Sequence, residues 1–194
     1  GLSGNLAGGT HHSHRGFGSG YCVFNDLSVC ALLARDRHGC SRVVVLDLDV
    51  HQGDGTATIL AGEEGVVTIS VHCAQNFPFR KTLSDHDIAV ESGVGDDEYL
   101  SVVDDAMALV EQYEPELLLF QAGVDGLAQD ALGRLELSRE GMRYRNKRVF
   151  DYVLDNEVPC VVFMGGGYSK PIDHTVDSLF DLFRGAANAN SLLP

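Results

Sequence analysis

The segment DLDVH, residues 47–51, places two carboxylates and an imidazole close together in the chain. It ends an apolar run with the β-branched content of a buried strand. Because side chains alternate along a strand, Asp47, Asp49 and His51 share a face for as long as the strand continues. Carboxylates avoid apolar surroundings unless a cation or hydrogen-bond donors compensate their charge. A divalent metal is the expected compensator, since Asp and His are suitable ligands for it.

A third candidate ligand lies far along the chain. Asp125 follows the apolar run 117–121, and together with Asp49 and His51 it would leave one coordination position open for water or substrate. An open position is typical of a catalytic metal site. A lone DxH pair would be better explained by chance, with Asp125 as a turn residue beside Gly126. A third carboxylate at another predicted strand end reverses that preference.

Two adjacent histidines, His11 and His12, follow a glycine pair. Imidazoles suit proton transfer near neutral pH, and they need carboxylate partners that fix the tautomer and the basicity. Asp47 and Asp54 are available for this purpose. A surface histidine cluster, which His14 suggests, explains the local sequence equally well.

The segment GGGYS, residues 165–169, is a further candidate. Glycines allow the backbone to approach a ligand closely, and the hydroxyl of Tyr168 could donate to a developing oxyanion. A bare turn is the alternative. Neither GGGY nor GDGT has the lysine and hydroxyl spacing of a phosphate-binding loop.

The elements that position these groups follow from the apolar pattern. Short apolar runs predict buried parallel strands at 43–48, 66–71, 117–121 and 159–164. Helical spacing predicts helices at 25–37, 96–113, 138–156 and 171–184. Alternating strands and helices predict an α/β fold with three layers, in which helices cover both faces of a mostly parallel sheet. Functional groups should then gather at the carboxyl ends of the strands.

The pattern also predicts the buried side of one helix and the number of domains. The helix at 171–184 is expected to place Val176, Leu179, Phe180 and Phe183 on one side. No repeat or internal boundary divides the chain, so residues 1–194 are expected to form a single domain.

The charge of the chain limits the classes of partner. Its 14 basic and 28 acidic residues give a net charge of −14, which argues against nucleic acid as the main partner. The charge is compatible with a cationic substrate, although general solubility explains it as well. No apolar stretch approaches the length of a membrane span, so no membrane partner is expected.

The five cysteines form no CxxC pair, and their odd number does not suit a closed disulfide framework. We therefore expect a reducing, cytoplasmic location. Cys30 and Cys160 lie in apolar runs and are expected in the core.

Several blocks together resemble the histone deacetylase family, which also includes acetylpolyamine amidohydrolases and acetoin-utilisation proteins. The blocks are GGTHH at 8–12, GYCVFND at 20–26, DLDVHQGDGT at 47–56, TISVH at 68–72, GVDGLAQDALG at 123–133 and GGGYS at 165–169. The resemblance implies the arginase/deacetylase fold. Relatives carry a substantial segment before the GG-x-HH block that this sequence lacks, so the fold is expected to be incomplete at the N-terminus.

The resemblance also implies roles for individual residues. A single catalytic Zn²⁺ would be bound by Asp49, His51 and Asp125, although this ligand set also accepts Fe²⁺, Co²⁺ or Mn²⁺. By motif position, His11 would pair with Asp47, His12 would pair with Asp54, and Tyr168 would hydrogen-bond the scissile carbonyl. The acyl-lysine channel would be lined by Gly20, Tyr21, Phe77 and Gly166. A structural K⁺ ion would be held by Asp47 and Ser70.

The implied activity is the hydrolysis of acetyl or other short acyl amides on lysine side chains, with His12 as general base. The substrate would be an acylated lysine peptide or protein, or an acetylated polyamine. Two alternatives are a two-metal, arginase-like hydrolase and a non-catalytic module that binds acyl ligands. The sequence does not indicate an oligomeric state.

Overall fold

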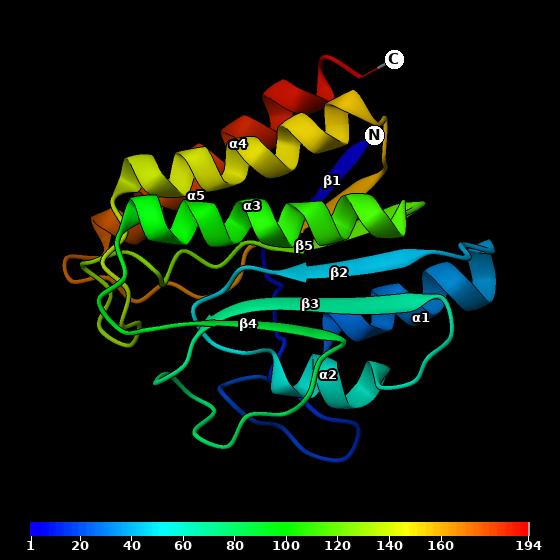
Figure 1. The fold of residues 1–194 in the computed structure, drawn as a ribbon, viewed down its shortest axis with the longest axis horizontal. Coiled ribbons are helices and arrows are strands. Elements are labelled where there is room, and N and C mark those ends of the chain that lie inside the picture. Colours follow the sequence, from blue (N-terminus) through cyan, green and yellow to red (C-terminus); the bar gives the residue numbers. More distant parts are fainter. Residues whose placement is uncertain (194) are drawn as a thin grey trace.

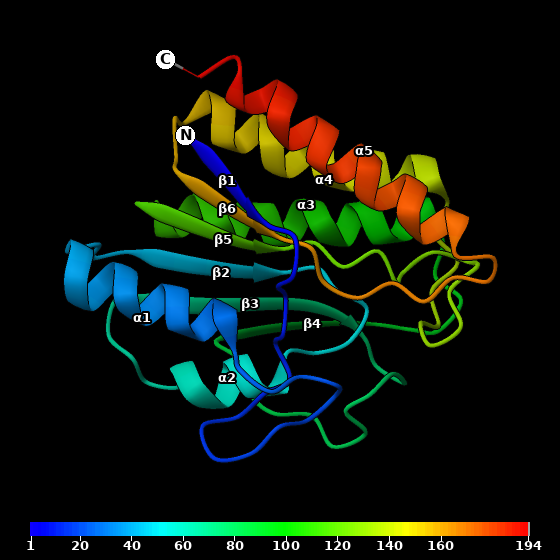
Figure 2. The same ribbon diagram turned by 180° about the vertical axis from the view of Figure 1, so that it is seen from behind.

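Six parallel strands form one sheet in the computed structural model, which describes residues 1–193. In sheet order the strands are β1 (Leu2–Asn5), β6 (Cys160–Phe163), β5 (Leu117–Gln121), β2 (Val43–Asp47), β3 (Val66–Cys73) and β4 (His86–Val90). Helices cover both faces of the sheet (Figures 1 and 2). The predicted α/β fold with a parallel sheet is confirmed.

The helices divide into two layers. Helices α1 (Asp26–His38) and α2 (Asp54–Leu60) cover one face, and helices α3 (Asp96–Tyr113) and α4 (Arg139–Asp155) cover the other (Figures 1 and 2). Helix α5 (Asp173–Asn190) packs against α4 and the edge strand β1. Because every strand is parallel, the carboxyl ends of β2, β5 and β6 meet at one edge of the sheet.

The central strand β2 is buried along its whole length. Val44 and Leu46 belong to the apolar cluster under α3, α4 and α5, whereas Val43 and Val45 belong to the cluster under α1 and α2. This alternation is expected for a strand with helices on both faces. It explains why the run is apolar on both sides.

Helix boundaries agree with the local capping signals. Helix α3 spans the predicted residues 96–113. The side chain of Ser138 accepts the N–H of Gly141 at the start of α4, and the side chain of Asn25 accepts the N–H of Ser28 at the start of α1.

The sequence pattern did not predict β1, β4 and α2. Strands β1 and β4 lie at the two edges of the sheet and are only partly buried, so their apolar signal is weak. Helix α2 has only 7 residues, which is too short for a clear helical period.

The predicted apolar stripe on α5 is wrong in part. Val176 is 56% exposed and Phe180 is 62% exposed, whereas Asp181 is buried. Oδ2 of Asp181 accepts hydrogen bonds from Arg139 at 2.6 Å and from Arg143 at 2.8 Å, both on α4. This pairing allows a polar side chain to occupy the helix–helix interface.

Of the two cysteines predicted in the core, Cys160 is buried and Cys30 is half-buried; all five cysteines are free thiols. No helix within residues 1–193 combines the length and the apolar character needed to cross a membrane.

Candidate active site

Strand β2 ends at Asp47, so Asp49 and His51 lie in the segment that follows it. The expectation that strand alternation alone aligns these side chains is therefore wrong. Oδ1 of Asp47 accepts the N–H of Asp49 at 3.1 Å, and Oδ1 of Asp49 accepts the N–H of His51 at 3.0 Å. Side chains that bond the backbone two residues ahead form tight local turns. Two such bonds in succession shape this segment.

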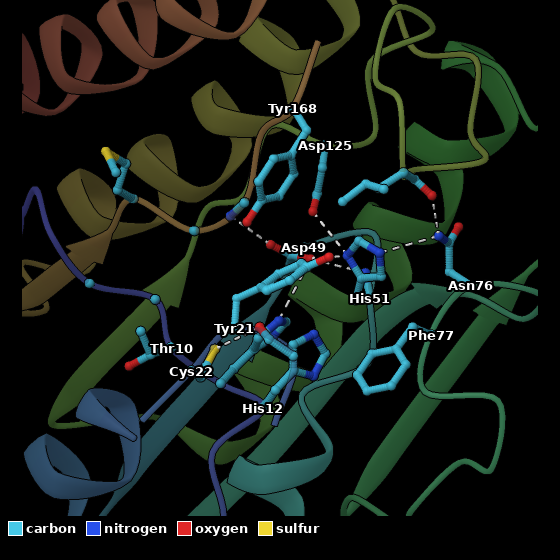
Figure 3. Close-up of a pocket in the computed structure, with 18 of the residues that line it drawn as sticks. Thr10, His12, Tyr21, Cys22, Asp49, His51, Asn76, Phe77, Asp125 and Tyr168 are labelled. Atoms are coloured by element: carbon cyan, nitrogen blue, oxygen red, sulfur yellow. Dashed lines mark hydrogen bonds and ion pairs between the residues drawn. The ribbon is translucent and has the colours of Figure 1, made fainter. Parts of the chain in front are cut away.

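Asp125 joins the site from the end of β5, which is the neighbour of β2 in the sheet. Nδ1 of His51 lies 3.0 Å from Oδ2 of Asp125 and 3.1 Å from Oδ1 of Asp49. One ligand atom from each of the three residues lies within 4.8 Å of the others. Both carboxylates are 1% exposed. Figure 3 shows the three side chains converging on the cavity.

The charges of these groups are strongly coupled. Burial raises the pKa of Asp125, and the charge of Asp49 adds to this effect, so that the pKa is about 7. Burial would also raise the pKa of Asp49, but the charge of His11 and the hydrogen bond to His51 hold it well below its usual range. Against the effect of burial, the two carboxylates raise the pKa of His51 to about 11.

Two close, buried carboxylates therefore depend on positive charge for their compensation. A divalent ion would supply that charge, and the two oxygen donors and one imidazole nitrogen would suit Zn²⁺ or a related transition metal. The residues present thus fit a metal ion.

Two histidine–carboxylate pairs flank this ligand set. Nδ1 of His11 lies 2.6 Å from Oδ2 of Asp47, and Nδ1 of His12 lies 2.7 Å from Oδ1 of Asp54. All four side chains are buried. In both pairs Nε2 is the nitrogen that remains for other contacts, and Nε2 of His11 lies 3.7 Å from Oδ1 of Asp49.

The two histidines differ in their proton affinity. Burial would lower the pKa of His11, but the charges of Asp47 and Asp49 and the bond to Asp47 outweigh burial and raise the pKa to about 9. Burial and the positive charge of His11 lower the pKa of His12, although Asp54 opposes them. His11 is therefore protonated at neutral pH, whereas His12 favours its neutral form.

The histidine loop is held by residues at the start of α1. Nδ2 of Asn25 donates to the carbonyl oxygens of His11 and Ser13, at 3.2 and 3.0 Å. The carboxylate of Asp26 accepts the N–H groups of Gly9 and Thr10, at 2.8 and 3.0 Å. These supporting roles were not predicted. An Asn followed by an Asp just before an apolar helical stretch is nevertheless a recognisable signal for the start of a helix.

A cavity of about 520 Å³ opens above the ligand set. All of the predicted channel residues line it, namely Gly20, Tyr21, Phe77 and Gly166, and so does Tyr168. The rings of Tyr21 and Tyr168 are 6.2 Å apart, and the ring of Phe77 is 4.9 Å from that of His12. Figure 3 shows Tyr168 and His12 on opposite sides of Asp49.

Tyr168 is fixed through its backbone by Asp130. Oδ2 of Asp130 accepts the N–H of Tyr168 at 2.6 Å, and the N–H of Gly166 donates to Oδ2 of Asp49 at 3.0 Å. The glycine segment thus contacts the ligand set directly. Asp130 lies in the block GVDGLAQDALG at 123–133, but its contact with Tyr168 was not predicted.

The predicted potassium ligands, Asp47 and Ser70, are register partners on β2 and β3. Both are buried, and Oγ of Ser70 lies 3.0 Å from Nδ1 of His72. The carboxylate of Asp47 is engaged by His11 and by the N–H of Asp49. The potassium site stays a prediction.

The sequence reasoning missed one neighbour of the ligand set. Nδ2 of the buried residue Asn76 lies 3.3 Å from Nε2 of His51 and donates to the carbonyl of Leu132 at 2.8 Å. Oδ1 of Asn76 accepts the N–H of Arg134 at 3.0 Å. An isolated Asn in a loop carries no pattern that would have revealed this position.

The fold and this site define an α/β protein with a candidate Asp–His–Asp metal centre at the carboxyl ends of its parallel strands. The family model described as "Histone deacetylase domain" matches residues 2–181. The chain belongs to the histone deacetylase family, as the resemblance of its motifs predicted.

Individual relatives agree with this assignment. The chain is 41% identical over 177 residues to an uncharacterized protein of Picosynechococcus sp., covering 91% of this chain and 59% of that protein. It is 35% identical to Histone deacetylase 2 of Arabidopsis thaliana, covering 93% of this chain and 48% of the relative. The chain spans about half the length of the curated relatives it matches.

A solved structure supports the fold. The crystal structure of the HDA15 HD domain superimposes with a TM-score of 0.79, at 23% sequence identity, and covers 92% of this chain and 54% of that domain. At this identity the likeness concerns the architecture alone.

Proposed function

We propose that this protein is a zinc-dependent deacetylase that removes acetyl or other short acyl groups from lysine side chains. The observation that carries the proposal is the placement of the His12–Asp54 pair beside the Asp–His–Asp set. The ring centroid of His12 lies 5.8 Å from that of His51, and both residues line the same cavity.

The metal would be held by Asp49, His51 and Asp125. We propose Zn²⁺, and the oxygen and nitrogen donors would also accept Fe²⁺, Co²⁺ or Mn²⁺. Such an ion, when bound, polarises the amide carbonyl and acidifies a water molecule. A structural K⁺ ion near Asp47 and Ser70 is a further part of the proposal.

His12 is the proposed general base. Its lowered pKa keeps the ring neutral near pH 7, and Asp54 holds Nδ1, so Nε2 can accept a proton from the attacking water. The same nitrogen then delivers the proton to the departing amine. His11 stays protonated and contributes positive charge beside Asp49.

Tyr168 is the proposed hydrogen-bond donor to the carbonyl oxygen. Its ring lines the cavity together with Tyr21 and Phe77. A hydroxyl that donates to the developing oxyanion stabilises the transition state more than the ground state. The aromatic rings would enclose the alkyl chain of the acylated lysine.

The charge beside the cavity favours a peptide substrate over a polyamine. Arg134 is exposed and lines the cavity, whereas the carboxylates that line it, Asp49 and Asp125, are buried in the ligand set. The net charge of −14 attracts cations at long range, but salt screens exposed charges beyond about 8–10 Å. A polyamine cation would therefore meet the repulsion of Arg134 at close range.

The proposal is tested with the metal-loaded protein and a panel of acyl-lysine peptides and acetylated polyamines, with products detected by mass spectrometry. We expect hydrolysis of acyl-lysine peptides and a loss of about 10²–10⁴-fold in kcat for His12→Ala. His38→Ala, at the exposed end of α1, is the control and should keep wild-type activity.

Two outcomes would favour the other candidates. Faster turnover of acetylated polyamines, with Arg134→Glu increasing that preference further, would support the polyamine hydrolase. Tight binding of acyl-lysine by the metal-loaded protein without any turnover would support the non-catalytic binding module.

A further inference from the structure

A buried arginine contacts the backbone segments that carry the candidate metal ligands. Arg145, on α4, is 0% exposed and is the largest fully buried side chain in the described part of the chain. Within residues 1–193, no carboxylate oxygen lies within 4.0 Å of its guanidinium nitrogens. A buried charge without a directly paired counterion is costly to desolvate, so its environment must compensate it.

All five N–H groups of this guanidinium have acceptors. Nη1 donates to the carbonyl oxygens of Gly123 at 2.6 Å and Leu48 at 3.2 Å, and Nη2 donates to the carbonyl of Ala122 at 3.1 Å. The Oδ1 atom of Asn146 accepts from Nε at 3.1 Å and from Nη2 at 2.8 Å. The planar fork is thus fixed in one orientation.

The three carbonyls belong to the segments that carry the candidate ligands. Leu48 directly precedes Asp49 in the segment that follows β2, and Gly123 lies two residues before Asp125 in the segment that follows β5. The guanidinium therefore links the segments that follow two neighbouring strands, close to the residues that carry the candidate ligands. The hydroxyl of Tyr99 adds a second donor to the carbonyl of Leu48, at 3.3 Å.

Arg145 and the ligand carboxylates all affect the pKa of Tyr99. Burial raises the pKa of Tyr99; the charge of Arg145 lowers it, and the charges of Asp125 and Asp49 raise it further. The pKa of Tyr99 thus responds both to the charge of Arg145 and to the charges of the two carboxylates.

We propose that Arg145 is a positioning residue for the metal ligands. Its guanidinium holds the segments that carry Asp49 and Asp125 at a fixed separation. This inference rests on the proposed metal site but not on the identity of the substrate. Arginine suits this task because lysine offers three N–H groups on one nitrogen, which cannot span carbonyls of two strands in the same way.

The test compares Arg145→Met and Arg145→Lys with the wild-type chain. The measured quantities are the dissociation constant for Zn²⁺ or Co²⁺, from competition with a chelator, and the visible absorption spectrum of bound Co²⁺, which reports coordination geometry. Supporting residues around a metal typically change its affinity by 10–100-fold. We expect Arg145→Met to weaken binding by about that factor and to alter the Co²⁺ spectrum.

Val149→Ala is the matched control, because Val149 is also fully buried on α4 but contacts the apolar cluster. It should lower the melting temperature and leave the metal dissociation constant and the Co²⁺ spectrum unchanged. Arg145→Lys keeps the charge and covers the case in which Arg145→Met does not fold; it should also bind metal more weakly than the wild type.

A folded Arg145→Met or Arg145→Lys variant with the wild-type dissociation constant and Co²⁺ spectrum would overturn the inference. An equal loss of metal affinity in Val149→Ala would also overturn it, because the effect would then be one of general stability. If the wild-type chain itself binds no metal, both the proposed function and the role of Arg145 are overturned. Metal binding without hydrolysis would contradict the proposed function alone. The metal dissociation constants and Co²⁺ spectra of the variants would still decide the role of Arg145.

Discussion

Gly166 lies against both carboxylates of the candidate metal site. A Cβ atom added at this position would overlap Oδ2 of Asp125 and would stand 3.2 Å from Oδ2 of Asp49. Its backbone φ angle lies outside the left-handed region, so alanine is conformationally acceptable there. The Gly166→Ala substitution therefore tests sterics at the ligand set without adding backbone strain.

The expected effect follows from the contact distances. Oδ2 of Asp125 would have to retreat by about 1 Å to reach an ordinary van der Waals distance from the new methyl group. This carboxylate cannot rotate away freely, because it is buried and Oδ1 accepts the N–H of Val50 at 3.0 Å. A misplacement of about 1 Å at a catalytic group can cost about 10²-fold in rate, which corresponds to about 2.7 kcal/mol.

The assay measures metal affinity and kcat/KM on an acyl-lysine peptide for Gly166→Ala. We expect a loss of about 10²-fold in kcat/KM together with weaker metal binding. Gly95→Ala is the control, because the nearest atom to an added Cβ there is a carbonyl oxygen at 4.0 Å and the φ angle is −96°. Wild-type metal affinity and kcat/KM in Gly166→Ala would refute the reasoning, since the site would then tolerate a methyl group between its carboxylates.

Three further outcomes are expected. Tyr168→Phe should lower kcat by about 10²–10³-fold while metal content, measured by elemental analysis, stays unchanged; an unaltered kcat would remove Tyr168 from the reaction. Asp125→Ala should lose its bound metal, and stoichiometric metal in that variant would contradict the ligand assignment. Asp181→Asn should lower the free energy of unfolding by about 1 kcal/mol at pH 7, since the bonds from Arg139 and Arg143 lower the pKa of Asp181 to about 2 while water screens the partly exposed arginines. A group with a lowered pKa stabilises the folded state above its unfolded pKa and loses that effect as the pH falls through the folded value. The difference between Asp181→Asn and the wild type, measured by denaturant titration, should therefore fall as the pH drops toward 2 and disappear below about pH 2. A constant difference would contradict this account.

The sequence predicted the interior of the sheet better than its edges. The runs that became β2, β3, β5 and β6 are apolar because helices cover both faces of a parallel sheet, and this burial leaves a clear pattern. Strands β1 and β4 are partly exposed, so the same physical signal is weak in them. The apolar pattern predicted the buried face of α5 wrongly in part. Asp181 is buried on that helix because it accepts hydrogen bonds from Arg139 and Arg143 on α4.

The sequence likewise predicted only part of the site. The residue types and the strand ends predicted that Asp49, His51 and Asp125 would gather at one edge of the sheet, and the structure brings their ligand atoms within 4.8 Å of one another. Strand alternation alone does not align Asp49 and His51, since β2 ends at Asp47 and hydrogen bonds to the backbone shape the following turn.

The sequence by itself thus determined the α/β architecture, the family and the carboxyl-end location of the chemistry, because these depend on local burial patterns and short motifs. Only the tertiary structure decided how the groups support one another. The resemblance implied the pairs His11–Asp47 and His12–Asp54, whose members lie 36 and 42 positions apart, but not the 2.6 and 2.7 Å at which they meet or the opposite pKa shifts of the two histidines. It did not indicate the contact between Arg145 and Leu48, which lie 97 positions apart. Side chains so far apart meet only when the sheet and its helices pack, and no local pattern encodes the distance or the charge at which they do so.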